Sequence, residues 1–354
     1  MKIDFIINSL TGGGAERVMV TLANGFSKFN DISIITFNSE NAYEVDSAVT
    51  RVKLHHGLYK NHTLRSWNNL YKHYKIKANR PDFIVVFLPE NALIAIPIAI
   101  RYGIRIIVSE HTNHKAFKYY KSKWTRKLLY PRANAVTVLT SYDIDFYSKL
   151  NSRVVKMPNP IILPKKVNAF SERKKNIFAA GSMKNLEVKG FDSMLKIAAP
   201  LLLKHKDWQI TIAGSGDGGI KKLKKLSKEL CIESQVILPG FCNNIQELMQ
   251  ESQLFALPSK FEGLPMVLME ALSNGMCCIA YDCVSGPRDL IENGKNGLLI
   301  ENQNADAFEK ELERLIADDE LRTNLAANAP KSVKDYALPS IMAKWTDLFK
   351  QLDA

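Results

Sequence analysis

The sequence predicts an α/β protein built from two Rossmann-like domains, each a doubly wound parallel sheet, that face a central cleft. Apolar runs alternate with amphipathic stretches along the whole chain, as in parallel strands covered by helices. The chain has 354 residues, more than one hydrophobic core usually serves, so two domains are expected. Ligands of such open sheets bind at the carboxyl ends of the strands, which is where the cleft belongs.

The first domain is expected over residues 1–164. A glycine turn follows its first strand and leads into the amphipathic stretch Val18–Phe26, so the domain opens with a strand, a tight turn and a helix. Its apolar runs predict strands at Lys2–Ile7, Ile32–Phe37, Val52–Leu54, Phe83–Phe87, Arg105–Ser109, Ala135–Leu139 and Arg153–Met157.

A proline-rich break marks the domain boundary. Pro158-Asn159-Pro160 and Pro164 precede a charged segment, and the pattern of apolar runs then restarts over residues 165–335. Helical periodicity at Asp306–Ala317 predicts a closing helix. A last helix within residues 336–354 is expected to cross back to the first domain. The strands of this half are predicted at Asn176–Ala180, Gln209–Ala213, Val236–Leu238, Leu254–Leu257, Cys277–Tyr281 and Leu298–Ile300.

Cysteine usage and hydropathy indicate a reducing compartment. The five cysteines form no Cys-x2-Cys pair and have no histidine partners at metal-ligand spacing, so they are expected to be small core residues. No apolar run approaches the roughly 18 residues that span a bilayer, and the first residues lead directly into a strand. We therefore expect a soluble or peripheral protein in the cytoplasm.

The positive charge is concentrated in the first half. The net charge is +12, and residues 1–164 hold 23 Lys and Arg against 11 Asp and Glu, whereas residues 165–354 hold 25 of each. This asymmetry predicts an anionic partner for the first half, either an acidic membrane surface or a phosphorylated substrate. Nucleic acid is the alternative, but no recognisable nucleic-acid module surrounds the basic residues, so no nucleic-acid partner is expected.

The most informative segment runs from Phe261 to Leu272 and contains Glu262 and Glu270, eight positions apart. Pro265 suits the first position of a helix that ends at Asn274-Gly275. Backbone N–H groups from Gly263 to Met266 would then face a phosphate at the positive end of the helix dipole. Glu270 could accept hydrogen bonds from a ribose diol. Two glutamates at this spacing occur by chance about once in a chain of this length. The prediction of a site therefore depends on the surrounding Gly-Leu-Pro and Ala-Leu.

With these neighbours the segment resembles the retaining glycosyltransferases of family 4, which have the GT-B architecture; the resemblance covers the whole chain. It implies a nucleotide-sugar substrate, a UDP-sugar in particular, no cofactor and no metal. Glu262 would position hydroxyls of the donor sugar and Glu270 would bind the ribose. The resemblance also implies donor contacts at Gly263, Leu264, Pro265, Met266, Gly214 and Phe241.

Two glycine-rich turns follow predicted strands. Gly12-Gly13-Gly14 precedes Glu16, and the resemblance implies that Gly13, Gly14 and Glu16 lie on the acceptor and diphosphate side; an ordinary strand-to-helix turn is the alternative. Gly214 to Gly219 is a literal Gly-x-Gly-x-x-Gly, which could indicate a dehydrogenase. The next strand ends in Pro239-Gly240-Phe241 without the acid that a dinucleotide ribose needs, so we interpret it as a glycosyltransferase turn.

Two further segments match family 4. In Gly181–Asp192, Lys189 matches the family lysine that holds the diphosphate. Ser182, however, stands where the family has arginine, so Lys184 or helix N-termini would have to supply the second positive charge for the diphosphate. Ser109-Glu110-His111-Thr112-Asn113 is similar to enzymes that extend polyprenyl-diphosphate-linked glycans with N-acetylgalactosamine or galactose. His111 would contact the transferred sugar, although a lone histidine is more often structural.

The segment Asn61–Arg80 is predicted to be a basic amphipathic helix, with Arg65, Lys72 and Lys75 among its cations. It could lie on lipid headgroups or hold a lipid diphosphate, or it could pack an aromatic face on its own domain. A second candidate for the same role lies between Tyr119 and Tyr130.

The function expected is retaining transfer of a hexose or N-acetylhexosamine to a lipid-linked, polyprenyl-diphosphate glycan at the inner face of a bacterial membrane. Such a transfer would serve the synthesis of surface polysaccharide. A sugar-nucleotide epimerase and an inactive nucleotide-binding module are the alternatives; the missing arginine favours the module.

Overall fold

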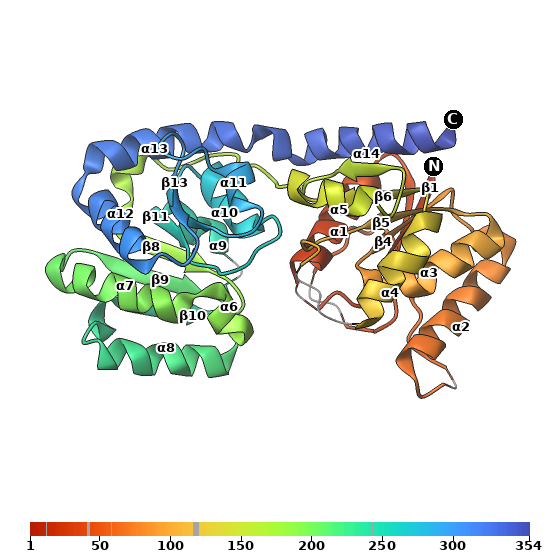
Figure 1. Cartoon of the computed structure of the whole chain (residues 1–354), viewed down its shortest axis with the longest axis horizontal. Helices are drawn as coiled ribbons and strands as arrows, with labels where there is room; N and C mark the ends of the chain where they lie inside the picture. Colours follow the sequence, from red (N-terminus) through yellow and green to blue (C-terminus); the bar gives the residue numbers. More distant parts are fainter. Residues whose placement is uncertain (12, 41–42, 58, 116–119, 243) are drawn as a thin grey trace. The chain divides into compact units, whose positions relative to one another are not determined.

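The computed structural model describes residues 1–354 apart from residues 12, 41–42, 58, 116–119 and 243. The chain divides into two compact units. Unit 1 comprises Met1–Pro160 together with Leu338–Ala354, and unit 2 comprises Ile161–Ala337. Each unit contains one parallel sheet flanked by helices, so the predicted α/β class with two Rossmann-like sheets is confirmed (Figure 1).

The sheet of unit 1 has seven strands in the order β3-β2-β1-β4-β5-β6-β7, and every neighbouring pair is parallel. The predicted strands are all present, with ends that shift by at most two residues. Their bounds are Lys2–Ile7 for β1, Asp31–Thr36 for β2, Thr50–Lys53 for β3, Phe83–Phe87 for β4, Arg105–Ser109 for β5, Ala135–Val138 for β6 and Val154–Lys156 for β7.

Alternating side chains of these strands fill two apolar layers. Ile6 and Ile84 belong to the core beneath one set of helices. On the other face, Phe83 and Phe26 pack against Phe349 near the C-terminus, with ring centroids 5.0 and 6.0 Å apart. Both faces of the sheet are therefore covered, which explains why the strands are nearly continuous apolar runs.

The helices of unit 1 come from both ends of the chain. Its last helix, α14, packs beside its first, α1 (Figure 1). Helix α2 is capped by the side chain of Asn61 and ends at Lys75, five residues earlier than predicted, because Ile76 adopts an extended backbone. The bounds are Gly14–Phe26 for α1, His62–Lys75 for α2, Pro89–Tyr102 for α3, Tyr120–Leu129 for α4, Ile144–Ser148 for α5 and Leu338–Asp353 for α14.

The sheet of unit 2 has six parallel strands in the order β10-β9-β8-β11-β12-β13. Its strands are β8 (Lys174–Ala180), β9 (Gln209–Ala213), β10 (Val236–Gly240), β11 (Ser252–Leu257), β12 (Cys277–Asp282) and β13 (Leu298–Glu301). Its helices are α6 (Leu186–Lys189), α7 (Phe191–Lys204), α8 (Asp217–Glu229), α9 (Ile245–Gln250), α10 (Met266–Ser273), α11 (Pro287–Leu290), α12 (Ala305–Ala317) and α13 (Asp319–Ser332). In the described part of the chain, no helix combines the length and the apolar character needed to cross a bilayer.

In each sheet, successive strands are first added on one side and then, after a single reversal of the strand order, on the other side. In unit 1 the reversal lies between β1 and β4, and in unit 2 it lies between β8 and β11. The loops that leave the carboxyl ends of these two strand pairs diverge to opposite faces of the sheet and leave a crevice between them. The fold therefore assigns one potential binding crevice to each unit.

A buried carboxyl group makes the stability of unit 1 depend on pH. Asp4 of β1 is 1% exposed and accepts a hydrogen bond of 2.8 Å from the Tyr74 hydroxyl of α2. Burial raises the pKa of Asp4 from 3.8 to about 7, although the Tyr74 hydrogen bond opposes the change. The folded state thus binds a proton that the unfolded state releases, and this group costs stability as pH rises from 3.8 to about 7.

We predict that Asp4→Asn, which removes the charge but keeps an oxygen for Tyr74, stabilises the protein at pH 8 by up to about 4 kcal/mol. At pH 4 the variant and the wild type should unfold at similar urea concentrations. Urea unfolding monitored by circular dichroism between pH 4 and pH 8 measures the difference. A difference between the two proteins that does not change with pH would contradict the assignment.

Candidate functional site

An ion pair connects the two loops that flank the crevice of unit 2. Lys189 ends α6 in the loop after β8, and Glu262 lies in the loop after β11. The Lys189 Nζ donates to Glu262 Oε1 at 2.7 Å, and the two side chains are 25% and 10% exposed. The sequence predicted both residues as site residues but not their contact. The crevice thus holds a cation and a carboxylate that already bind each other.

Backbone contacts fix the position of Lys189. Gly190 has a φ of +69° and lies so close to the Pro258 carbonyl that a Cβ would collide with its oxygen. The Lys260 N–H donates to the Val188 carbonyl at 2.9 Å. The loops after β8 and β11 are therefore joined by backbone on either side of Lys189, and its side chain starts from a fixed point.

Glu262 is held from the opposite side by the loop after β12. The buried Ser285 hydroxyl hydrogen-bonds to the carbonyls of Glu262 at 3.0 Å and Gly263 at 3.2 Å. Gly286 has a φ of +91°, and a Cβ there would collide with the Gly263 carbonyl. Ser285 and Gly286 therefore support the loop that carries the Glu262 carboxylate.

Helix α10 begins one residue later than predicted. Pro265 has an extended backbone and occupies the N-cap, and its carbonyl accepts the first helical hydrogen bonds from Leu268 and Met269. Glu270 lies within the helix and is only 4% exposed. The helix ends at Ser273, and Gly275 has the positive φ that the predicted C-terminal signal requires.

The glycine turn after β9 packs against the segment after β8. A Cβ on Gly214 would overlap the Gly181 carbonyl, and a Cβ on Gly219 would overlap the Met183 carbonyl. Ser182 begins this segment, and the Met183 N–H next to it donates to the Ser215 carbonyl at 2.9 Å. Close approach of protein backbone to protein backbone therefore explains these glycines without a bound dinucleotide.

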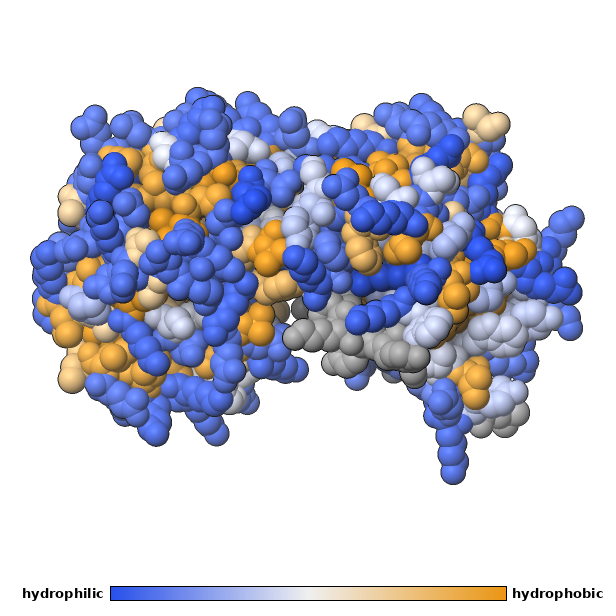
Figure 2. Space-filling model, in the orientation of Figure 1, coloured by the Kyte–Doolittle hydropathy of each residue, from blue (hydrophilic) through white to orange (hydrophobic). Residues whose placement is uncertain are grey.

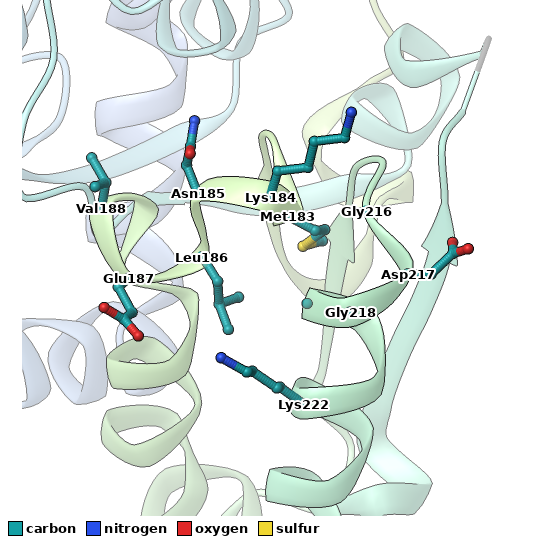
Figure 3. Close-up of a pocket in the computed structure, with 11 residues that line it drawn as sticks. Met183, Lys184, Asn185, Leu186, Glu187, Val188, Gly216, Asp217, Gly218 and Lys222 are labelled. Atoms are coloured by element: carbon teal, nitrogen blue, oxygen red, sulfur yellow. The ribbon is translucent and has the colours of Figure 1, made fainter.

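A pocket of about 690 Å³ lies between the segment after β8 and the start of α8. Exposed Lys184 lies on its rim, and Lys222 points from α8 towards Leu186, whereas the side chain of Asp217 points away from α6 (Figure 3). Lys189 and Glu262 are not among the described residues that line this pocket. Phe241, 73% exposed, is not among them either.

His111 is fixed at the carboxyl end of β5 in unit 1. Its ring stacks on Phe87 at 4.3 Å between centroids, and Nε2 lies 3.0 Å from the Ser109 hydroxyl. Burial lowers the pKa of His111 to about 3, although a hydrogen bond with Asn159 opposes the change. The ring is therefore neutral near pH 7 and is suited to hydrogen bonding rather than to proton transfer.

A buried charged cluster that the sequence did not reveal holds the loop of His111. Glu110, 1% exposed, accepts two hydrogen bonds from Arg126 at 3.0 Å and one from the Tyr130 hydroxyl at 2.5 Å. Arg126 and Tyr130 belong to the second predicted membrane segment and are buried, so this part of the prediction is wrong. Tyr119 of the same segment lies outside the described residues.

The first glycine turn accommodates a side chain of its own helix. A Cβ on Gly13 would overlap the Glu16 carboxylate, whereas a Cβ on Gly14 would meet nothing within 4 Å. Burial raises the pKa of Glu16, and a hydrogen bond from its own backbone opposes the change. The Glu16 carboxylate is the end of a flexible side chain and could move away from a Cβ at Gly13, so sterics require glycine at neither position.

Helix α2 has one buried face and one exposed face. Leu70 and Tyr74 are buried in the core of unit 1, so this face of the helix packs on its own domain, as one of the two alternatives predicted. Leu64 and Trp67 are 57% and 41% exposed. Among the predicted cations of this helix, Lys72 and Lys75 are exposed, whereas half-buried Arg65 donates to the Tyr59 carbonyl at 3.5 Å.

Two family models cover most of the sequence. Residues 164–332 match the model described as "Glycosyl transferases group 1", and residues 12–163 match the model described as "Glycosyltransferase Family 4".

Two curated relatives align over nearly the full length. One is the Campylobacter jejuni "GalNAc-alpha-(1->4)-GalNAc-alpha-(1->3)-diNAcBac-PP-undecaprenol alpha-1,4-N-acetyl-D-galactosaminyltransferase", 30% identical over 99% of both chains. The other is the Erwinia amylovora "Amylovoran biosynthesis glycosyltransferase AmsD", 31% identical over 98% of this chain and 97% of the relative.

Among solved structures, Anabaena HepE in complex with UDP and glucose superimposes with a TM-score of 0.83. The alignment covers 99% of each chain at 15% sequence identity, so this likeness concerns the fold alone.

We predict that Ser285→Ala destabilises unit 2 by about 1–3 kcal/mol, because two carbonyls in a buried loop lose their shared donor. Ser332→Ala, which removes one hydrogen bond to Ala329 inside α13, is the control and should have a smaller effect. Urea unfolding of both variants measures the difference. Equal stability of Ser285→Ala and wild type would show that the serine does not support the Glu262 loop.

Proposed function

Because the chain belongs to the group 1 and family 4 glycosyltransferases, we propose that it transfers a hexose or N-acetylhexosamine from a UDP-sugar to a lipid-linked glycan. The transfer retains the configuration at the anomeric carbon and serves synthesis of a bacterial surface polysaccharide. It uses no cofactor and no metal. Two relatives are named for polyprenyl-diphosphate acceptors in Campylobacter jejuni, and the solved structure of HepE contains UDP, which supports this choice of substrates.

The observation that carries the proposal is the ion pair of Lys189 and Glu262 at the crevice of unit 2. A diphosphate leaving group is anionic and binds an ammonium ion through charge-assisted hydrogen bonds. Sugar hydroxyls donate to carboxylates. In the proposed complex the diphosphate takes Lys189, and Glu262 turns to hydroxyls of the donor sugar. The pair in the free protein keeps both groups within reach of one ligand.

Other site residues have supporting roles in the proposal. Glu270 binds the ribose, and the backbone from Gly263 to Met266, at the start of α10, stabilises the diphosphate as the glycosidic bond breaks. Neutral His111 donates to or accepts from a hydroxyl of the transferred sugar. The leaving phosphate oxygen takes the proton of the acceptor hydroxyl, so a separate catalytic base is not required.

The acceptor side of the proposal includes the membrane surface. Helix α2 exposes Leu64, Trp67 and the lysines Lys72 and Lys75, and Figure 2 shows hydrophilic surface with separate hydrophobic areas over this part of unit 1. Aromatic and leucine side chains insert at the headgroup level while lysines bind anionic headgroups. We therefore propose peripheral association with the inner face of the cell membrane, with a lipid-linked diphosphate near these lysines.

The proposed roles of the two glutamates lead to different kinetic effects. We predict that Glu270→Gln weakens UDP binding at least tenfold, and that Glu262→Gln leaves UDP binding within threefold but lowers turnover at least tenfold. Calorimetry with UDP measures the first effect. Nucleotide release from UDP-, GDP- and ADP-sugars, with and without a bacterial lipid extract, measures the second. Glu320→Gln, at an exposed site on α13, is the control.

Release of one nucleotide only with lipid extract would support the transferase. Conversion of the donor sugar without any acceptor would instead support the epimerase. Binding of UDP without release from any donor would support the inactive module. Equal effects of Glu262→Gln and Glu270→Gln would contradict their separate roles.

The membrane proposal is tested by charge reversal. We predict that Lys72→Glu with Lys75→Glu weakens binding to phosphatidylglycerol vesicles at least tenfold, because each lysine near an anionic surface contributes about 1 kcal/mol. The matched control is Lys221→Glu with Lys224→Glu, which makes the same charge change at the same spacing on exposed positions of α8. Equal loss in both double variants would mean that only net charge matters.

A further inference from the structure

A cavity of about 440 Å³ lies entirely within unit 1, and the proposed donor site does not use it. Its walls include Asn8 and Ser9, which follow β1, and Leu88 and Asn91, which follow β4. These two strands flank the point at which the sheet of unit 1 reverses. The cavity therefore occupies the crevice that the topology assigns to a ligand.

The walls of this cavity are fixed before any ligand binds. Leu88 has φ 71° and ψ 147°, a backbone region that is essentially restricted to glycine, and its N–H donates to the Ser109 carbonyl at 3.1 Å. Asn91, 3% exposed, donates to the Phe87 carbonyl at 2.7 Å. Ser122 of α4 donates to Glu90 Oε1 at 3.2 Å. A strained backbone and three hydrogen bonds thus hold the lining groups in place.

The charge of the lining is negative. The described residues around the cavity include two acidic side chains, Glu16 and Glu90, and no lysine or arginine. Burial and the charge of Arg65 lower the pKa of His62, so this lining residue is neutral near pH 7. Both glutamates lie in the first turns of their helices, α1 and α3, and already complement the positive ends of those helix dipoles. A phosphate or uronate would meet repulsion here.

The remaining lining suits a neutral sugar. Carboxylate, amide and hydroxyl oxygens accept hydrogen bonds from sugar hydroxyls, and apolar side chains can cover the C–H face of a ring. The cavity volume falls in the range of small-molecule sites, about 300–1,000 Å³. The groups that fit this description are Asn8, Ser9, Asn91 and Thr63 as polar partners and Leu93 and Ile94 as apolar ones.

We propose that this cavity binds a neutral sugar ring of the acceptor glycan and that Glu16 and Glu90 exclude acidic sugars. The inference rests on the proposed transferase and adds the chemical class of its acceptor. It also gives Glu16 a different role from the one implied by resemblance. Glu16 contacts a sugar ring, and the acceptor diphosphate binds elsewhere.

The test uses methyl galactoside and methyl N-acetylgalactosaminide as neutral probes and methyl galacturonide as the acidic probe. Saturation-transfer NMR on the full chain measures their affinities. We expect wild type to bind at least one neutral probe at least tenfold more tightly than the uronide. Glu90→Lys, at an exposed rim position, should reduce this preference at least fivefold. Asp347→Lys, an exposed site on α14 outside the cavity, makes the same charge change and should leave the preference unaltered.

Three results would overturn the inference. They are equal binding of neutral and acidic probes, no binding of any neutral probe at 100 mM, and the same response from Glu90→Lys and Asp347→Lys. UDP binding and donor consumption in the same samples test the transferase separately. If UDP binds and donor is consumed while no glycoside binds, the cavity assignment fails alone. If neutral glycosides bind but no nucleotide sugar is bound or consumed, the transferase proposal fails and the sugar site stands.

Discussion

Direct contact between backbone segments is the constraint on which the functional loops of unit 2 depend. At four places a glycine stands where any Cβ would collide with a carbonyl of another loop. The pairs are Gly190 with Pro258, Gly214 with Gly181, Gly219 with Met183, and Gly286 with Gly263. Together they join the loops after β8, β9, β11 and β12 at one edge of the sheet. The side chains of Lys189 and Glu262 start from this joined layer, which is why two long, flexible residues meet in one geometry.

The ion pair has a consequence for how an anion is bound. In the free protein Glu262 neutralises Lys189, so the ammonium group of Lys189 is not an isolated charge. An incoming diphosphate in the proposed mechanism must compete with the carboxylate for the ammonium. The resemblance to family 4 implies an arginine at the position of Ser182, so the proposed mechanism has fewer fixed cations to draw on here. Backbone dipoles at the start of α10 would then carry a larger share of the stabilisation. In the proposal, Glu262 releases Lys189 to the diphosphate and then binds the donor sugar. Binding of the diphosphate and binding of the sugar would therefore be coupled.

The strands could be predicted because their signal is local, whereas the site contacts could not. Every predicted strand is present, since a buried parallel strand is a continuous apolar run. The contact of Lys189 with Glu262 spans 73 positions and depends on which strands are neighbours. Arg126 looked like a surface cation because its sequence neighbours are basic, yet a buried glutamate 16 positions away binds it. The strained backbone of Leu88 also had no signal, because leucine has no preference for a positive φ.

The return of α14 to unit 1 determines the order in which the chain can fold during synthesis. All of unit 2 leaves the ribosome before Leu338–Ala354 does, so unit 2 can complete its core while unit 1 still lacks one helix. Until Phe349 is available, Phe26 and Phe83 each lack a ring that they contact in the folded unit. A nascent unit 1 therefore exposes apolar surface that α14 later covers, for the time needed to translate unit 2. Chaperone binding during translation would be directed to this surface.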